Sequence, residues 1–280
     1  MRLTFSFIPT ITWLSLIAIP TMASPASADN GDSCEAKWSA NSAQFVNQEN
    51  PDYSGLLAYW QQQASECKGT GAYEARLAVI YLYLDQPREA RSALEQARKR
   101  RSRYASLIEL VAFMSESFAL VAQSPIDEVK MEEFGKRVYA YASRNPERAD
   151  VLAYAGGIQT TLGHHDRAIA LLEKALALSK AGQPISLAGL YRNATISYAA
   201  LQRYSEAYDA GGAALSENKG VMADAEFMYA VINTQAELGQ LDAAKTSAEV
   251  LVAKTPAVRT DPEFAALVAY LKDKFKAAAK

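Results

Sequence analysis

The fold is decided by a pattern that occurs four times: LDQPREARSALEQARK at 84–99, LGHHDRAIALLEKALA at 162–177, LQRYSEAYDAGGAALS at 201–216 and LGQLDAAKTSAEVLVA at 238–253. Each copy has a short polar turn, a small residue and then an amphipathic run with the period of a helix. The small residues at the same point of each copy are Ala90, Ala168, Ala207 and Ala244. Their spacings are 78, 39 and 37 residues, so the first interval contains an additional, divergent copy.

These copies resemble the tetratricopeptide repeat, a helical hairpin with a period of about 34 residues. The resemblance rests on small residues where two helices approach: Ala78, Ala90 and Ala97, then Gly156, Ala168 and Ala175, then Thr195, Ala207 and Ala214. The last copy departs from the pattern, because Ile232 and Leu251 stand where small residues are expected. The resemblance implies an all-α, right-handed superhelical solenoid of stacked antiparallel helix pairs with a C-terminal capping helix.

We divide the chain at the ends of these patterns. Residues 34–70 are expected to form an N-terminal helical hairpin, and 71–258 to form about five helix pairs. The second pair, around 104–146, lacks the small residues of the others. Residues 259–280 are expected to form the capping helix, with Asp261 as its N-cap and a proline at its first position.

The first 28 residues have the pattern of a signal peptide, with Arg2 before an apolar run and small residues at Ala26 and Ala28. Cleavage is expected between Ala28 and Asp29, which leaves a short disordered start at 29–33. No later segment is apolar enough to span a bilayer, so we expect no transmembrane segment in the mature chain. The protein is therefore expected to be exported to the periplasm, or alternatively secreted.

Export changes how the only two cysteines, Cys34 and Cys67, are interpreted. An even number of cysteines in an oxidising compartment favours one disulfide bond. The bond would join the open ends of the 34–70 hairpin and stabilise it by about 3 to 4 kcal/mol. The alternative is two buried thiols.

The resemblance to tetratricopeptide repeats implies a concave groove that binds a peptide or a helix of a partner protein. Groove positions of the family fall on Tyr83, Asp150, Thr161, Arg192, Tyr229, Asn233 and Glu237. We expect Arg192 to contact the partner, and the alternative is a solvated arginine. The tyrosines at positions such as 81 and 198 are interpreted as packing residues.

The two histidines, His164 and His165, precede Asp166 and raise the question of a metal site. On the repeat template they occupy the turn between two helices, where the other copies have unrelated residues. A third ligand would have to come from elsewhere in the chain. We therefore expect a turn, and neither a metal nor a cofactor.

A basic run near the end of the first copy contains Arg98, Lys99, Arg100, Arg101 and Arg103. It is either a patch for an acidic partner or the solvated end of a helix, where cations suit the negative dipole. The formal net charge of −2 argues against nucleic acid as a partner. No H-E-x-x-H, G-x-S-x-G or Walker pattern occurs, so we expect no enzyme activity.

The sequence thus favours an exported, non-catalytic scaffold that binds another protein or peptide, in a bacterial cell envelope. An assembly or chaperone factor for an envelope or secretion complex is the first alternative. A role in small-molecule binding or catalysis at the groove is the second. The oligomeric state stays open.

Overall fold

The computed structural model describes residues 51–279, apart from 64–66, 101–103 and 184, and four earlier residues at 38, 42, 44 and 45. All regular secondary structure in this part of the chain is helical. The predicted signal peptide, residues 29–33 and Cys34 lie outside the described residues, so cleavage after Ala28 and the disulfide bond stay predictions. No described helix has the length and hydropathy needed to cross a membrane.

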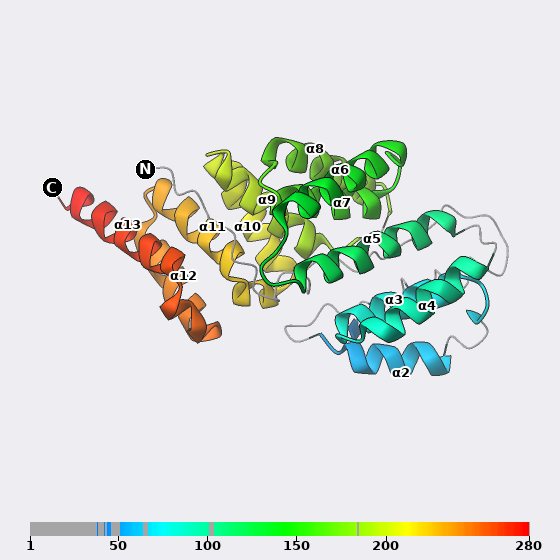
Figure 1. Ribbon diagram of the computed structural model, residues 1–280. Helices are drawn as coiled ribbons and strands as arrows, with labels where there is room; N and C mark the ends of the chain where they lie inside the picture. Colours follow the sequence, from blue (N-terminus) through cyan, green and yellow to red (C-terminus); the bar gives the residue numbers. More distant parts are fainter. Residues whose placement is uncertain are drawn as a thin grey trace. The chain divides into compact units, whose positions relative to one another are not determined.

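The helices follow one another in adjacent pairs, with two short 3₁₀ segments between later pairs (Figure 1). Their bounds are α2 (Tyr53–Gln63), α3 (Ala72–Tyr83), α4 (Pro87–Lys99), α5 (Ala105–Val121), α6 (Glu128–Arg144), α7 (Ala149–Thr161), α8 (His165–Lys180), α9 (Leu187–Ala200), α10 (Tyr204–Glu217), η3 (Lys219–Ala223), α11 (Ala225–Glu237), α12 (Leu241–Lys254), η4 (Pro256–Thr260) and α13 (Pro262–Ala278). The divergent copy is the pair α5 and α6, which lies between α4 and α7 in the chain.

The described residues form two compact units. The N-terminal unit contains those up to 155 and 174–186, and the C-terminal unit contains 156–173 and 187–279. In the N-terminal unit α3 packs against α2, α4 and α5, and α4 also packs against α5. In the C-terminal unit α11 packs against α9, α10, α12 and α13.

One turn geometry joins the helices of the four repeated copies. The residue five positions before the marker alanine has a positive φ in each copy, at Asp85, Gly163, Gln202 and Gly239. The next amide then donates back to a carbonyl five residues earlier, as His164 N does to Gln159 O at 2.9 Å. This is the Schellman motif, which ends a helix by satisfying its last carbonyls. The turns therefore repeat at the level of individual hydrogen bonds.

Small residues let the two helices of a pair approach. The four marker alanines are each at most 1% exposed. In the histidine copy a Cβ atom on Gly156 would lie 2.7 Å from Leu172 Cδ2, closer than real Cβ atoms come to other atoms. In the last copy Ile232 and Leu251 are fully buried instead. That pair fills its helix contact with large side chains, as its sequence predicts.

The last helix, α13, begins as predicted. Asp261 is its N-cap and accepts a hydrogen bond from Glu263 N at 2.8 Å, and Pro262 is its first residue. Leu267 and Leu271 of α13 are buried in the same cluster as Ile232 and Leu251. The helix thus covers apolar surface of the last pair.

Candidate functional site

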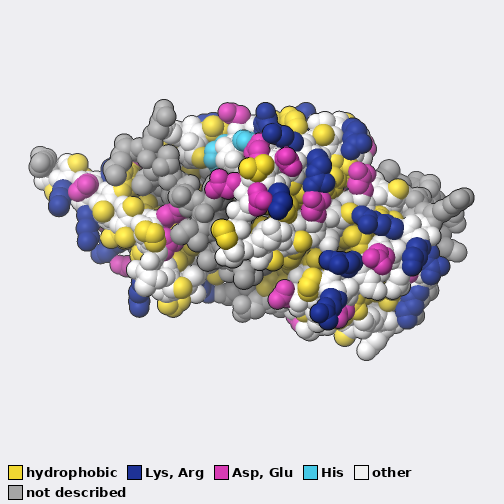
Figure 2. All heavy atoms as spheres, viewed as in Figure 1, with side chains coloured by type: hydrophobic (Ala, Val, Ile, Leu, Met, Phe, Trp, Pro, Cys, Tyr) yellow, Lys and Arg dark blue, Asp and Glu magenta, His cyan; other side chains and the backbone are white. Residues whose placement is uncertain are grey.

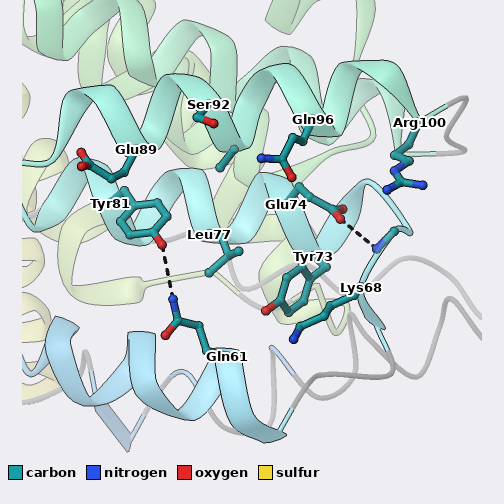
Figure 3. Close-up of a pocket in the computed structure, with 12 residues that line it drawn as sticks. Gln61, Lys68, Tyr73, Glu74, Leu77, Tyr81, Glu89, Ser92, Gln96 and Arg100 are labelled. Carbon is teal, nitrogen blue, oxygen red and sulfur yellow. Dashed lines mark hydrogen bonds between the residues drawn. The ribbon is translucent and has the colours of Figure 1, made fainter.

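A groove of about 830 Å³ lies over α3 in the N-terminal unit, with α2 on one side and α4 on the other (Figure 3). It is lined by Gln61, Lys68, Gly69, Tyr73, Glu74, Leu77, Tyr81, Glu89, Ser92, Ala93, Gln96 and Arg100. These residues come from α2, α3 and α4, from the loop before α3, and from the C-cap position of α4, which is Arg100. The groove is partly open to solvent, so it does not enclose a small molecule.

The loop at one end of the groove is fixed by a buried carboxylate. Glu74 accepts hydrogen bonds from Gly69 N at 2.8 Å and from Gly71 N at 2.9 Å. Both glycines have positive φ, which other residues adopt only at a cost in free energy. Glu74 therefore holds the loop and the start of α3 together, and both of its oxygens are used in doing so.

The walls of the groove are held by aromatic contacts and hydrogen bonds between helices. Trp60 of α2 stacks on Tyr73 of α3 with ring centres 5.7 Å apart, and its Nε1 donates to Tyr73 O at 3.2 Å. Burial raises the pKa of Tyr73, with Glu74 as the next cause. Further along, Gln61 Nε2 donates to Tyr81 Oη at 3.3 Å. The groove is thus part of the packed structure of the N-terminal unit.

Three of the charged side chains that line the groove, Lys68, Glu74 and Arg100, lie at the loop end, whereas Glu89 lies at the other end (Figure 3). Leu77 and Ala93 supply apolar surface between them. The groove thus offers mixed polar and apolar surface, with two cations and one carboxylate at the loop end.

Arg100 is the link between this groove and the predicted basic patch. Arg98, Lys99 and Arg100 are exposed, and the first two lie in the last turn of α4, where cations suit the helix dipole. Arg101 and Arg103 lie outside the described residues. Lys and Arg side chains are numerous on the surface over α3 and α4 (Figure 2).

No family model and no curated protein matches the chain. Among solved structures, a chain in the crystal structure of the APC/C hetero-tetramer Cut9-Hcn1 is similar, with a TM-score of 0.59 and 15% identity. The match covers 86% of this chain and 42% of that chain, so this chain spans less than half of that protein's length. That neighbour is a tetratricopeptide-repeat protein. The chain has a tetratricopeptide-repeat fold. The all-α class expected from the four repeated copies is confirmed.

Tyr83, a predicted groove residue, lies among other aromatic side chains. Its ring stacks on Tyr53 at 4.7 Å with an angle of 7° and meets Phe118 edge-on at 5.8 Å. Burial, with Tyr53 and Tyr154 nearby, raises the pKa of Tyr83 well above its usual value. Tyr53, Phe118 and Tyr154 all belong to the N-terminal unit. Asp150 lies in the same unit and pairs with Arg148, Nη2 to Oδ2 at 2.6 Å.

The expectation that Arg192 is either a partner contact or a solvated side chain needs correction, because its side chain is only 4% exposed. Its guanidinium donates to Asp224 at 2.9 to 3.2 Å through Nε and Nη2, and to Glu226 Oε2 at 3.0 Å. Nη1 donates to Asn193 Oδ1 at 2.7 Å. A buried cation requires such partners, and here it joins α9 to α11. Burial raises the pKa of Glu226 to about 8, although Arg192 lowers it.

The remaining predicted groove residues also make contacts within the repeat fold. Tyr229 Oη donates to Asp261 Oδ2 at 2.6 Å, and Asn233 is buried. Glu237 accepts hydrogen bonds from Tyr270 and from Lys274 Nζ of α13. Thr161 Oγ1 donates to Gly157 O of its own helix at 3.1 Å. Tyr83 and Asp150 belong to the N-terminal unit and the other predicted groove residues to the C-terminal unit. Whether any of them contacts a partner stays a prediction.

Both histidines were expected in the turn, but only His164 lies there, whereas His165 is the first residue of α8. His164 Nδ1 is 3.0 Å from Gln159 Oε1, and His165 Nδ1 is 3.3 Å from Ser197 Oγ. Burial lowers the pKa of His165, which favours its neutral form. Among the described residues no group of three His, Cys, Asp or Glu side chains is arranged to hold a metal ion.

Sequence reasoning missed most residues of the groove. Tyr81, interpreted as a packing residue, is half-buried and lines the groove, and so does Leu77. The stretch CKGTG at 67–71, followed three residues later by Glu74, is the available signal, because paired glycines before a glutamate suit a turn that a carboxylate holds. That signal indicates the loop, but it does not indicate that α2 and α4 stand on either side of it.

Proposed function

We propose that this chain is a non-catalytic scaffold that binds a segment of a partner protein in the groove over α3. The observation that carries the proposal is the groove itself, which is open to solvent and lined by apolar, polar and charged side chains of α2, α3 and α4. Repeat folds of this kind expose extended binding surfaces, because each helix pair contributes to the same face. The absence of known catalytic motifs from the sequence supports a binding role rather than a chemical one.

We further propose that the protein acts in a bacterial cell envelope after export. Support comes from residues 1–28, whose charge, apolar run and Ala26 and Ala28 fit a signal peptide. N-terminal sequencing of the mature protein from a periplasmic extract tests this part. A mature chain that begins at Asp29 is expected, and an uncleaved chain in the cytoplasm would contradict export.

The binding role is tested with a photoreactive amino acid placed on α4. Gln96 lines the groove, whereas its neighbour Glu95 is exposed but does not line it. We expect a protein adduct from position 96 that is absent from position 95, and mass spectrometry identifies the adduct. Adducts of the same kind from both positions, or from neither, would contradict the proposal.

The identified partner is then purified and titrated with this chain. Ser92→Trp fills the groove from an exposed position on α4, and Glu95→Trp adds the same side chain outside it. We expect the first variant to weaken binding by about tenfold or more and the second to change it by less than about twofold. Equal effects of the two variants would show that the partner binds elsewhere.

A further inference from the structure

We propose that the loop end of the groove receives acidic side chains of the bound segment. This inference rests on the proposed function, because it names the chemistry of the segment that the groove binds. The occupant is a segment of a partner protein with Asp or Glu at one end and apolar residues beside them.

Two cations from different elements lie at this end of the groove. Lys68 belongs to the loop before α3, and Arg100 is the C-cap residue of α4 (Figure 3). Gly69 stands beside Arg100, and a Cβ atom on Gly69 would be 3.5 Å from Arg100 Nη1. The guanidinium of Arg100 therefore lies beside the backbone of Gly69, which has no side chain.

One carboxylate, Glu74, also lies at this end of the groove, and its oxygens are bound by the loop backbone rather than by these cations. Within the described ranges, neither Lys68 nor Arg100 pairs with a carboxylate. A guanidinium binds a carboxylate through two parallel hydrogen bonds, and a nearby ammonium adds a second attraction.

The rest of the groove sets the direction of the segment. Leu77 and Ala93 accept apolar side chains, and Glu89 repels acidic residues at the far end. The chain as a whole has a formal net charge of −2, so general attraction does not account for a preference for acidic peptides. Such a preference must come from local cations.

The test uses a random peptide library displayed on phage, selected against the full chain. Parallel selections use the double variant Lys68→Gln and Arg100→Gln, and the control double variant Arg98→Gln and Lys99→Gln. The control makes the same change in net charge at exposed positions on the same helix end, but outside the groove. Circular dichroism and thermal unfolding establish that both variants are folded.

We expect peptides selected by the wild-type chain and by the control to be enriched in Asp and Glu, and those selected by the groove variant to lack this enrichment. For the best peptide, the groove variant should weaken binding by about tenfold, and the control by less than about twofold. Added salt should weaken wild-type binding and affect the groove variant less.

Peptides without acidic enrichment, or equal loss of binding in both variants, would overturn the inference. The proposed function is tested separately by the adduct at position 96. If a partner is captured there but the library shows no acidic preference, the inference fails and the function stands. If acidic peptides bind but no partner is captured, the function fails and the charge preference stands.

Discussion

Arg192 and Tyr229 occupy the same position in successive repeats, and each donates to the N-cap aspartate of a helix 32 residues further along the chain. Arg192 binds Asp224 at the start of α11, and Tyr229 binds Asp261 at the start of α13. Each aspartate also caps its own helix, because it accepts a backbone hydrogen bond from the first turn. The contact of α9 with α11 is thus repeated between α11 and α13, with an arginine as the donor in one case and a tyrosine in the other.

The first prediction concerns the loss of the buried cation. Arg192→Ala leaves Asp224 and Glu226 buried without it and should lower the free energy of unfolding by about 3 to 5 kcal/mol. Arg192→Lys keeps the charge and should cost less. Lys245→Ala, at an exposed pair 4.0 Å from Glu249, should cost less than about 1 kcal/mol. Urea denaturation measures all three, and equal losses in the alanine variants would refute the assigned role.

The second prediction concerns pH. Burial raises the pKa of Glu226 to about 8 in the folded protein, from an ordinary value near 4.5. The folded state therefore holds a proton that the unfolded state has released between these pH values. The contribution of this proton to the free energy of unfolding is fully present below the ordinary pKa. It is lost as the pH rises through the folded-state pKa of about 8. Glu226→Gln should remove this dependence.

The measurement is urea denaturation of the wild type and the Glu226→Gln variant between pH 5.5 and 8.5, roughly the window in which the two states differ in protonation. The difference between the two curves isolates Glu226, since other titrating groups are common to both proteins. Wild-type stability should fall relative to the variant as pH rises, with a slope of at most about 1.4 kcal/mol per pH unit. A flat or rising difference would contradict the burial of a protonated carboxyl.

The third prediction compares two helical glycines. A Cβ atom on Gly156 would lie 2.7 Å from Leu172, whereas one on Gly212 of α10 would have no atom within 4 Å. Gly156→Ala should destabilise the protein by about 1 to 3 kcal/mol through overpacking. Gly212→Ala should stabilise it by up to about 1 kcal/mol, because alanine favours a helix. Thermal unfolding should give shifts of opposite sign, and two shifts of the same sign would refute the close approach.

The fourth prediction concerns the turns. Gln202 has a φ of 61° and Gly163 a φ of 74°, at the same position in adjacent copies. Gln202→Gly should stabilise the protein by about 0.5 to 1 kcal/mol, since glycine adopts positive φ without a clash. Gly163→Ala should destabilise it by about 1 kcal/mol for the converse reason. Unfolding midpoints measure both, and a stable Gly163→Ala variant would contradict the shared turn.

The sequence predicted the repeated helices because their signals are local. The marker alanines, the turn residues and the period of the apolar residues lie within sixteen consecutive residues of each copy. The histidines illustrate the same point, since comparison of the copies predicts a turn, in which His164 lies, and the adjacent His165 begins α8. The start of α13 at Asp261 and Pro262 was likewise predicted from adjacent residues.

The candidate site was not predicted because its parts are distant in the sequence. Gln61, Lys68 and Arg100 belong to separate segments, and no local pattern shows that they line one groove. Arg192 was misjudged for the same reason, since its carboxylate partners lie more than thirty residues later. A charged residue in a helix is usually exposed, and only tertiary contacts reveal that this one is buried.

The repeated contact of Arg192 and Tyr229 also has a consequence for the gain and loss of repeats in evolution. Because both contacts span 32 residues, the stretch 201–237 begins and ends at equivalent points of the repeat. A tandem duplication of that stretch would give each new first helix a donor before it and a capping aspartate at its start. The gene could therefore gain or lose a whole helix pair in one event, without a second mutation to repair the junction.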